Sequence, residues 1–179
     1  RVLDLFCGQG ENVALIHTKW KLAQIDGIDY NQVMLLEAQK KFPATNLQFI
    51  HKDFFIHDFQ EKKYDAIVSS FGIKCIEAEL YPKLLNKLKS LLNTKGKISF
   101  VEIVRSDNKL FNWVFDIYFK LIVRLYSKGN KALRNDYYAL LLFMDLFKED
   151  KFIQAVRQSN FNYKRKKTAI PFIRLYELF

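Results

Sequence analysis

The sequence predicts an α/β fold built on a Rossmann-like, mostly parallel sheet, with helices on both faces and a helical insertion after the fifth strand. Over the first hundred residues, apolar runs of strand length alternate with longer amphipathic stretches, and this spacing requires crossover connections between parallel strands. The first strand ends in a glycine-containing turn that opens a helix. The alternation then stops after residue 104, where a segment without strand patterns begins.

The helix at 79–92 has the most regular pattern, because Leu84, Leu85 and Leu88 recur at three- and four-residue spacing before the closing turn at 93–96. Helices are also expected at 11–18, 31–42 and 150–158, and strands at 2–6, 22–28, 47–51, 66–70, 97–104, 161–166 and 172–178.

Residues 105–147 form the predicted insertion. The helix expected at 110–126 is apolar around most of its circumference and carries one narrow polar stripe, with a repeat of four residues: Asp116, Lys120, Arg124 and Lys128. A polar hinge at 128–135 leads into a second apolar block at 137–147. A helix that is apolar nearly all round needs to be buried. We interpret the insertion as a substrate lid, with a core or dimer helix as the alternative.

Length and residue usage predict one domain over 1–179, since a chain of this size can bury a core of its own. The sequence starts at Arg1 inside an apolar strand pattern, so we interpret it as lacking its natural N-terminus. Two cysteines, Cys7 and Cys75, are too few for a disulfide framework, which favours a reducing, cytoplasmic setting. The three histidines are scattered, so no metal site is expected.

The chain is basic, with 29 basic and 19 acidic side chains and a net charge of +10. Such a charge suits nucleic acid, an anionic membrane surface or a lysine-rich solvated surface, and does not choose among them. The basic run is 164–167, Lys-Arg-Lys-Lys, which we interpret as a solvated connecting loop. Charges interrupt every long apolar segment, so no transmembrane-length run is present in the sequence.

Three strand ends carry residues suited to a nucleoside ligand. Gly8 and Gly10 follow the first strand, where glycine lets the backbone approach a ligand closely, although Val13 replaces the third glycine of a dinucleotide fingerprint. Asp29 ends the second strand and can accept hydrogen bonds from both ribose hydroxyls. Asp53 follows the third strand and can accept from an adenine amino group. Singly, each is more often a turn, cap or loop residue; together they favour one binding crevice.

These residues lie in recognisable motifs. Residues 2–10 resemble the V-L-D-x-x-C-G-x-G motif of class I S-adenosylmethionine-dependent methyltransferases, and 27–35 resemble their G-I-D-x-S-x-x-M-L motif. Residues 64–68 are similar to the fourth-strand motif and 92–96 to the L-K-P-G-G turn, without its proline. The resemblance covers 1–105 and implies seven strands, the last antiparallel, with S-adenosylmethionine as cofactor. The implied cofactor-binding residues are Asp4, Gly8, Gln9, Gly10, Asp29, Tyr30, Asp53, Phe54 and Ser70.

A narrower resemblance concerns the substrate. Residues 70–75, Ser-Phe-Gly-Ile-Lys-Cys, resemble the S-F-G-[LI]-R-N segment of the menaquinone/ubiquinone biosynthesis C-methyltransferases. That family's E-F-x-[KR]-P-x-N-x-L…Y-D-x-Y pattern is matched by Glu102, Arg105, Asn108, Leu110, Asp116 and Tyr118. Lys74 stands for the family's Arg, Cys75 for its Asn and Lys109 for its Pro, and the glycines near the C-terminus are absent. The resemblance implies C-methylation of a lipophilic quinol or phenol in quinone biosynthesis; the departures leave open a different substrate or a loss of activity.

Methylation of a phenolic ring carbon sets the remaining expectations. The acceptor has to be held in line with the methyl group in a dry site, and its phenolate has to be stabilised. Lys74 is the candidate catalytic residue for that electrostatic role, with a solvated surface lysine as the alternative. The expected partner is a lipophilic small molecule, with peripheral membrane contact through the apolar insertion and a homodimer as further expectations.

Two rival functions are weighed against this one. RNA or DNA methylation suits the basic charge, but the fourth strand ends in Ser-Ser-Phe-Gly, without the Pro-Pro-aromatic signature that holds a flipped base. Lys74 rather than proline precedes Cys75, so the pyrimidine carbon-5 nucleophile is missing as well, and nucleic acid is not the expected partner. A non-catalytic partner subunit with this fold is the other rival; the intact glycine and aspartate set favours retained cofactor binding.

Overall fold

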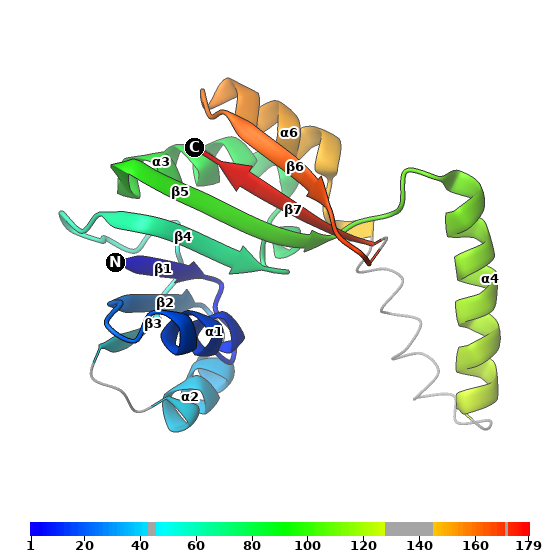
Figure 1. Cartoon of the computed structure of the whole chain (residues 1–179), viewed down its shortest axis with the longest axis horizontal. Coiled ribbons are helices and arrows are strands. Elements are labelled where there is room, and N and C mark those ends of the chain that lie inside the picture. The colour runs from blue at the N-terminus through cyan, green and yellow to red at the C-terminus, as the bar shows by residue number, and fades with distance from the viewer. Residues whose placement is uncertain (43–45, 128–144, 171) are drawn as a thin grey trace.

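The computed structural model describes residues 1–42, 46–127, 145–170 and 172–179. Its centre is a seven-stranded sheet in the order β3-β2-β1-β4-β5-β7-β6 (Figure 1). The strands are β1 (Val2–Leu5), β2 (Ile25–Asp29), β3 (Leu47–His51), β4 (Tyr64–Ser70), β5 (Leu92–Ile103), β6 (Tyr163–Lys167) and β7 (Ile173–Leu178).

The strand directions confirm the predicted mostly parallel sheet. β1 pairs in parallel with β2 and β4, β2 with β3, and β4 with β5. β7 runs antiparallel to both of its neighbours, β5 and β6. The chain therefore leaves β1 toward β2 and β3 on one side and returns to β4 on the other. This reversal beside β1 is where open α/β sheets bind ligands, at the carboxyl ends of the strands.

Helices occupy the crossovers, as predicted. The helices are α1 (Glu11–Lys19), α2 (Gln32–Lys41), α3 (Tyr81–Leu91), α4 (Lys109–Tyr126) and α6 (Glu149–Gln158), with 3-10 turns η1 (Ile73–Cys75) and η2 (Ala78–Leu80). The Asn31 side chain caps α2 by accepting the Met34 N–H at 3.2 Å. Pro82 lies in the first turn of α3, where its missing N–H costs no helical hydrogen bond, so the α-helix begins two residues later than the predicted start.

Each face of the sheet has its own core, because successive side chains of a strand point to opposite faces. Leu3, Leu5 and Ile67 belong to the larger cluster, together with apolar side chains of α3 and α6. Val2 and Val68 pack instead with a smaller cluster built around α1. Figure 1 shows α3 and α6 on one side of the sheet and α1 with α2 on the other. Helices on both faces are therefore confirmed.

Two boundaries differ from prediction for identifiable reasons. β5 starts at Leu92 rather than 97, because Leu92 pairs with Tyr64 before a register shift brings Lys97 opposite Ala66. A side chain at Gly96 would come within 2.9 Å of the Tyr64 carbonyl oxygen, so this irregularity needs glycine. β2 starts at residue 25 rather than 22, since the preceding residues form a turn in which the Ala23 N–H bonds to the Trp20 carbonyl.

The strand predicted at 161–166 is observed as β6 (Tyr163–Lys167) and includes the basic run, so the interpretation of that run as a connecting loop is wrong. These residues form most of β6, which lies at the edge of the sheet and pairs with β7 alone. Their side chains are exposed, as expected for a solvated run. Lysine on an edge strand discourages pairing with another chain, which gives the run a structural purpose without a ligand.

The predicted insertion begins with α4, which stands beyond the carboxyl end of β5 and away from the sheet (Figure 1). Phe111 and Phe115 contact the Phe172 ring, at centroid distances of 5.5 and 4.3 Å, and Phe119 stacks on Phe115. Arg105 ties the helix down by donating to Asp116 at 2.5 Å. The predicted hinge at 128–135 and most of the second apolar block lie outside the described residues.

Most of the surface of α4 is exposed within the described chain, so the alternative of a core helix is wrong. Val123 is its buried apolar residue, and the opposite side of the helix from Phe115 carries Trp113, Ile117 and Leu121, which are 62%, 49% and 54% exposed. Phe115 and Phe119 pack around Phe172 with Ile103. No helix in the described part of the chain is long and apolar enough to cross a membrane.

Candidate functional site

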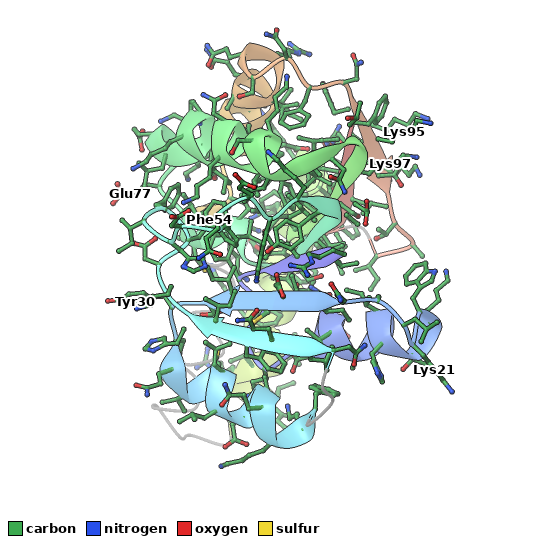
Figure 2. The ribbon with its side chains drawn as sticks, turned by 90° about the vertical axis from the view of Figure 1, so that its left-hand side faces the viewer. Lys21, Tyr30, Phe54, Glu77, Lys95 and Lys97 are labelled. Carbon is green, nitrogen blue, oxygen red and sulfur yellow. The ribbon has the colours of Figure 1, made fainter. Side chains whose placement is uncertain are left out.

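A cavity of about 850 Å³ opens at the carboxyl ends of β1, β2, β3 and β4. Figure 2 shows Tyr30, Phe54 and Glu77 gathered at this end of the molecule, away from the labelled lysines at the opposite end. The volume is in the range of small-molecule sites. Six of the residues predicted from the sequence line it, and all of them lie at the carboxyl end of a strand or just after it: Gly8, Asp29, Tyr30, Asp53, Phe54 and Ser70.

The glycine turn is locked to the second strand end. The Gly8 N–H donates to Asp29 Oδ2 at 2.8 Å. Gly8 has φ +52° and Gly10, the N-cap of α1, has φ +83°, both in the left-handed region that favours glycine. A Cβ on Gly10 would also come within 3.1 Å of the Phe42 ring. The two glycines therefore let the turn close tightly between β1 and α1.

Asp29 is oriented by two backbone groups. Its Oδ1 accepts the Asn31 N–H at 2.8 Å, while Oδ2 accepts from Gly8. A carboxylate has about four acceptor positions, so both oxygens keep capacity for a second donor. Since Asp29 lines the cavity, those remaining positions suit two neighbouring hydroxyl groups, such as those of a ribose.

Asp53 organises the loop after β3. Its Oδ1 accepts the Phe55 N–H at 2.7 Å, and its carbonyl accepts the His57 N–H at 2.9 Å. Phe54 is buried and meets Phe6 edge-on, at a centroid distance of 6.1 Å. This arrangement sets an acidic side chain beside aromatic walls, which suits the polar edge and the faces of an adenine ring.

Asp4 lies at the inner end of a hydrogen-bond chain. Asn12 donates to Asp4 Oδ1 at 2.9 Å, and Ser70 donates to Asn12 Oδ1 at 2.9 Å. Asp4 is fully buried, and burial raises the pKa of its carboxyl to about 7, with a smaller opposing effect of the Asn12 hydrogen bond. Among the described residues, its Oδ2 has no hydrogen-bond partner. A buried acceptor of this kind is costly without a ligand and fits a cationic group bound close by.

Two strained residues shape the cavity and escaped sequence reasoning. Phe6 directly follows β1 and Phe71 directly follows β4, with φ +57° and +59°, and both line the cavity. A left-handed backbone is costly for such side chains and tends to persist at functional sites. Gly72 allows the two loops to meet, because a Cβ there would lie 2.7 Å from the Phe6 Cβ. In the sequence, Phe71 and Gly72 are only a Phe-Gly dipeptide, which does not show the backbone strain or the close approach of Phe6.

Four predicted residues are not among those that line the cavity: Asp4, Gln9, Gly10 and Lys74. Asp4 accepts a hydrogen bond from Asn12 of α1, and Gly10 is the N-cap of that helix. Gln9 is exposed and accepts from Lys41 Nζ at 3.1 Å. The Lys74 ammonium lies 5.5 Å from the centroid of the Phe71 ring, which itself lines the cavity. Lys74 is thus one side chain removed from the cavity wall.

Sequence reasoning also missed the apolar wall contributed by the segment after β4. Cys75, Ile76 and Leu80 line the cavity there, beside the acidic Glu77. Glu102 of β5 holds this segment, since its Oε1 accepts the Ile73 N–H at 2.6 Å. Burial raises the pKa of the Glu102 carboxyl to about 7. The sequence offered one signal for Glu102, its place in the narrower family motif.

Comparison with known proteins agrees with this geometry. A family model described as a methyltransferase domain matches residues 2–96, more than half of the chain. The chain belongs to this family. With its seven-stranded sheet and strand-end acidic residues, it is a class I S-adenosylmethionine-dependent methyltransferase domain, as the resemblance implied.

Curated relatives of this methyltransferase domain act on different molecules. The demethylmenaquinone methyltransferase of Staphylococcus epidermidis is 24% identical over 170 residues, which cover 94% of this chain and 63% of the relative. Trans-aconitate 2-methyltransferases of Escherichia coli are 36% identical over 101 residues, covering 55% of this chain and 37% of theirs. The chain spans less than two thirds of the length of these relatives.

Solved structures share the methyltransferase fold. The plantazolicin methyltransferase BpumL in complex with SAH matches with a TM-score of 0.69 at 17% identity, over 99% of this chain and 74% of that one. A putative O-methyltransferase from Nostoc punctiforme matches with a TM-score of 0.73 at 15% identity, over 99% of this chain and 50% of that one. The predicted Rossmann-like methyltransferase fold is confirmed.

Proposed function

We propose that the chain is the cofactor-binding and catalytic part of a methyltransferase that transfers a methyl group to a ring carbon of a lipophilic quinol or phenol. The observation that carries the proposal is the division of the cavity into two parts. Aspartates at successive strand ends form one part, and the apolar segment after β4 forms the other. The first suits the nucleoside of S-adenosylmethionine and the second suits an apolar acceptor.

The cofactor part is built from this chain's own polar groups. Asp29 would accept from the ribose hydroxyls, and Asp53 would accept from the adenine amino group, with Phe54 packed beside it. Asp4 would compensate the positive charge of the cofactor's amino end through the chain that reaches Ser70. The orphaned Asp4 Oδ2 and the positive φ of Gly8 are the features of the described residues that support this fit. When bound, the sulfonium supplies an electrophilic methyl group.

The acceptor part has to hold a ring in line with that methyl group and keep water away. Phe71, Ile76 and Leu80 offer apolar surface for this purpose. Lys74, beside Phe71, would stabilise the phenolate that makes the ring carbon nucleophilic. An anionic acceptor suits this wall less well, because Glu77 and both cavity aspartates would repel it and Lys52 is the cation that lines the cavity among the described residues.

Insertion α4 would bring the lipophilic acceptor to the site. Its outward side, with Trp113, Ile117 and Leu121, presents large apolar side chains beside the basic Lys120 and Arg124, and the chain carries a net charge of +10. Such a helix suits the surface of an anionic bilayer, where a quinol with a long apolar tail dissolves. The alternative use of the same side is a homodimer contact.

Transfer of labelled methyl from S-adenosylmethionine to a prenylated quinol tests the proposed reaction. We expect transfer by the wild type and its loss in Asp29→Ala. Replacing Trp113 and Leu121 with Glu should reduce binding to anionic vesicles and turnover of the tailed quinol, while a tail-less quinol serves as the control. Methyl incorporation into RNA in place of quinol would favour the nucleic-acid alternative. Cofactor binding without transfer to either would favour the non-catalytic subunit.

A further inference from the structure

The loop after β3 lines the part of the cavity that is proposed to receive adenine. The conformation of this loop depends on its contacts with the rest of the domain. Residues 53–59 contribute Asp53, Phe54 and Phe55 to the cavity wall. The hydrogen bonds from the N–H groups of Phe55 and His57 to Asp53 curl the loop around its own aspartate. Those bonds are local to the loop, so they shape it without attaching it to the rest of the domain.

The buried Phe54 and Phe59 rings attach the loop to the core, and the Lys83 ammonium lies 5.4 Å from the centroid of the Phe55 ring. Lys87 of α3 adds polar contacts to this attachment. Its ammonium donates to the His57 carbonyl at 2.8 Å and to the Phe55 carbonyl at 3.2 Å. The same ammonium lies over two aromatic rings, 5.2 Å from the centroid of Phe54 and 5.5 Å from that of Phe59. One side chain thus contacts the loop at two carbonyls and two rings.

Lys87 is fixed both by the helix that carries it and by the loop that it contacts. Lys87 comes from a helix whose inward side is fully buried through Leu84, Leu85 and Leu88. Hydrogen bonds from an ammonium are stronger than neutral ones, and a cation over an aromatic face adds attraction. Burial lowers the pKa of the Lys87 ammonium, while the nearby Asp53 carboxylate acts in the opposite direction. The positive charge of Lys87 is therefore also attracted by the carboxylate of Asp53, which lines the cavity.

We infer that Lys87 is a positioning residue, which holds the loop at 53–59 in the conformation that presents Asp53 and Phe54 to the adenine of the cofactor. Lys87 itself is not among the residues that line the cavity, so it acts through the loop. The inference rests on the proposed function, because it assumes that this part of the cavity receives adenine. The motifs matched in the sequence do not include Lys87; its contacts identify it.

Replacing Lys87 with Met keeps the apolar stem and removes every donor. We expect the loop to sample other conformations, and a site that is ordered about a tenth of the time binds its ligand about tenfold more weakly. S-adenosylhomocysteine affinity, measured by calorimetry, should fall by that factor. The preference for the adenosyl over the inosyl analogue should narrow as well. Lys87→Arg retains donors and charge and should restore most of the affinity.

Lys89 provides a matched control on the same helix. It donates to the Ser159 and Asn160 carbonyls at 2.8 and 3.0 Å and lies 5.1 Å from the centroid of the Phe161 ring. Its chemistry repeats that of Lys87, but its partners follow α6, away from the cavity. Lys89→Met should therefore lower the melting temperature without changing S-adenosylhomocysteine affinity or analogue preference.

The outcomes separate the inference from the proposed function. If folded Lys87→Met binds S-adenosylhomocysteine as tightly as the wild type, with the same analogue preference, the inference is overturned and the proposed function stands. Equal losses of affinity in Lys87→Met and Lys89→Met would also overturn it, because the effect would then be one of general stability. Should Lys87→Met fail to fold, Lys87→Gln replaces it in the same comparison. A wild type that does not bind S-adenosylhomocysteine would overturn the proposed function and the inference with it.

Discussion

Replacement of Asp4 with Asn should lower the cofactor affinity and raise the stability of the cofactor-free domain at high pH. Asp4 is fully buried, and its pKa is raised from 3.8 to about 7, chiefly by burial. Glu11 and Asp29 add smaller raising effects through their negative charge. The folded state therefore binds this proton more tightly than the unfolded state does. Stability is lost as pH rises from the unfolded pKa through the folded one and levels off above it.

The magnitude follows from the two pKa values. Each unit of difference corresponds to about 1.4 kcal/mol, so the ionised carboxyl costs the folded, cofactor-free domain about 4 kcal/mol above pH 7. At pH 5 Asp4 is protonated in the folded state and mostly ionised in the unfolded state. Folding then costs about 1.7 kcal/mol, the free energy of binding that proton at this pH. Asparagine resembles the protonated acid and has no such pH dependence. Its unpartnered amide group costs about 1–3 kcal/mol at every pH.

Urea unfolding of the cofactor-free wild type and of Asp4→Asn at pH 5 and pH 8 measures this difference. We expect the stability of Asp4→Asn relative to the wild type to rise by about 2.5 kcal/mol between the two pH values. Glu102, whose pKa is also raised to about 7, contributes equally to both proteins and cancels. The same relative stability at both pH values would refute the assignment of a raised pKa to Asp4. Undiminished S-adenosylhomocysteine affinity in the variant would remove Asp4 from cofactor binding.

Three further substitutions test the cavity. Asp29→Ala should weaken S-adenosylhomocysteine binding by about 1.5–3 kcal/mol, the range for hydrogen bonds to a charged group, and unchanged affinity in calorimetry would exclude Asp29 from the site. Asp53→Ala should narrow the preference for adenosyl over inosyl analogues, whereas an equal loss for both would contradict its role at adenine. Gly72→Ala should lower the melting temperature and cofactor affinity together, because the new Cβ would lie 2.7 Å from the Phe6 Cβ. A Gly72→Ala protein with wild-type values for both would show that the loops at Phe6 and Phe71 separate easily.

Local pattern explains why the first two thirds of the fold could be predicted. The alternation of apolar runs and amphipathic stretches depends on neighbours within a few residues, and it placed β1, β3 and α2 within one or two residues of their observed bounds. Gly8, Asp29 and Asp53 were predictable for a related reason. Each lies at the carboxyl end of a strand or within three residues after it, and parallel strands bring their carboxyl ends to one edge of a sheet.

Contacts between distant segments decided the rest. Lys87 is one lysine among many in the sequence, and only the packing of α3 beside the loop after β3 gives it two carbonyl partners. The pattern at 161–166 predicted a strand, but its place at the edge of the sheet follows from its pairing with β7 alone. Phe115 and Phe119 pack with Phe172, which is distant from them in the sequence.

The division has one physical reason. Period, turn residues and strand-end chemistry are encoded within short windows, and they determined the sheet, its helices and the acidic rim of the cavity. The backbone strain at Phe6 and Phe71, the raised pKa of Asp4 and the hold of Lys87 on its loop arise from burial and from atoms far apart in sequence. Such properties exist only once the tertiary structure has excluded water and brought those atoms together.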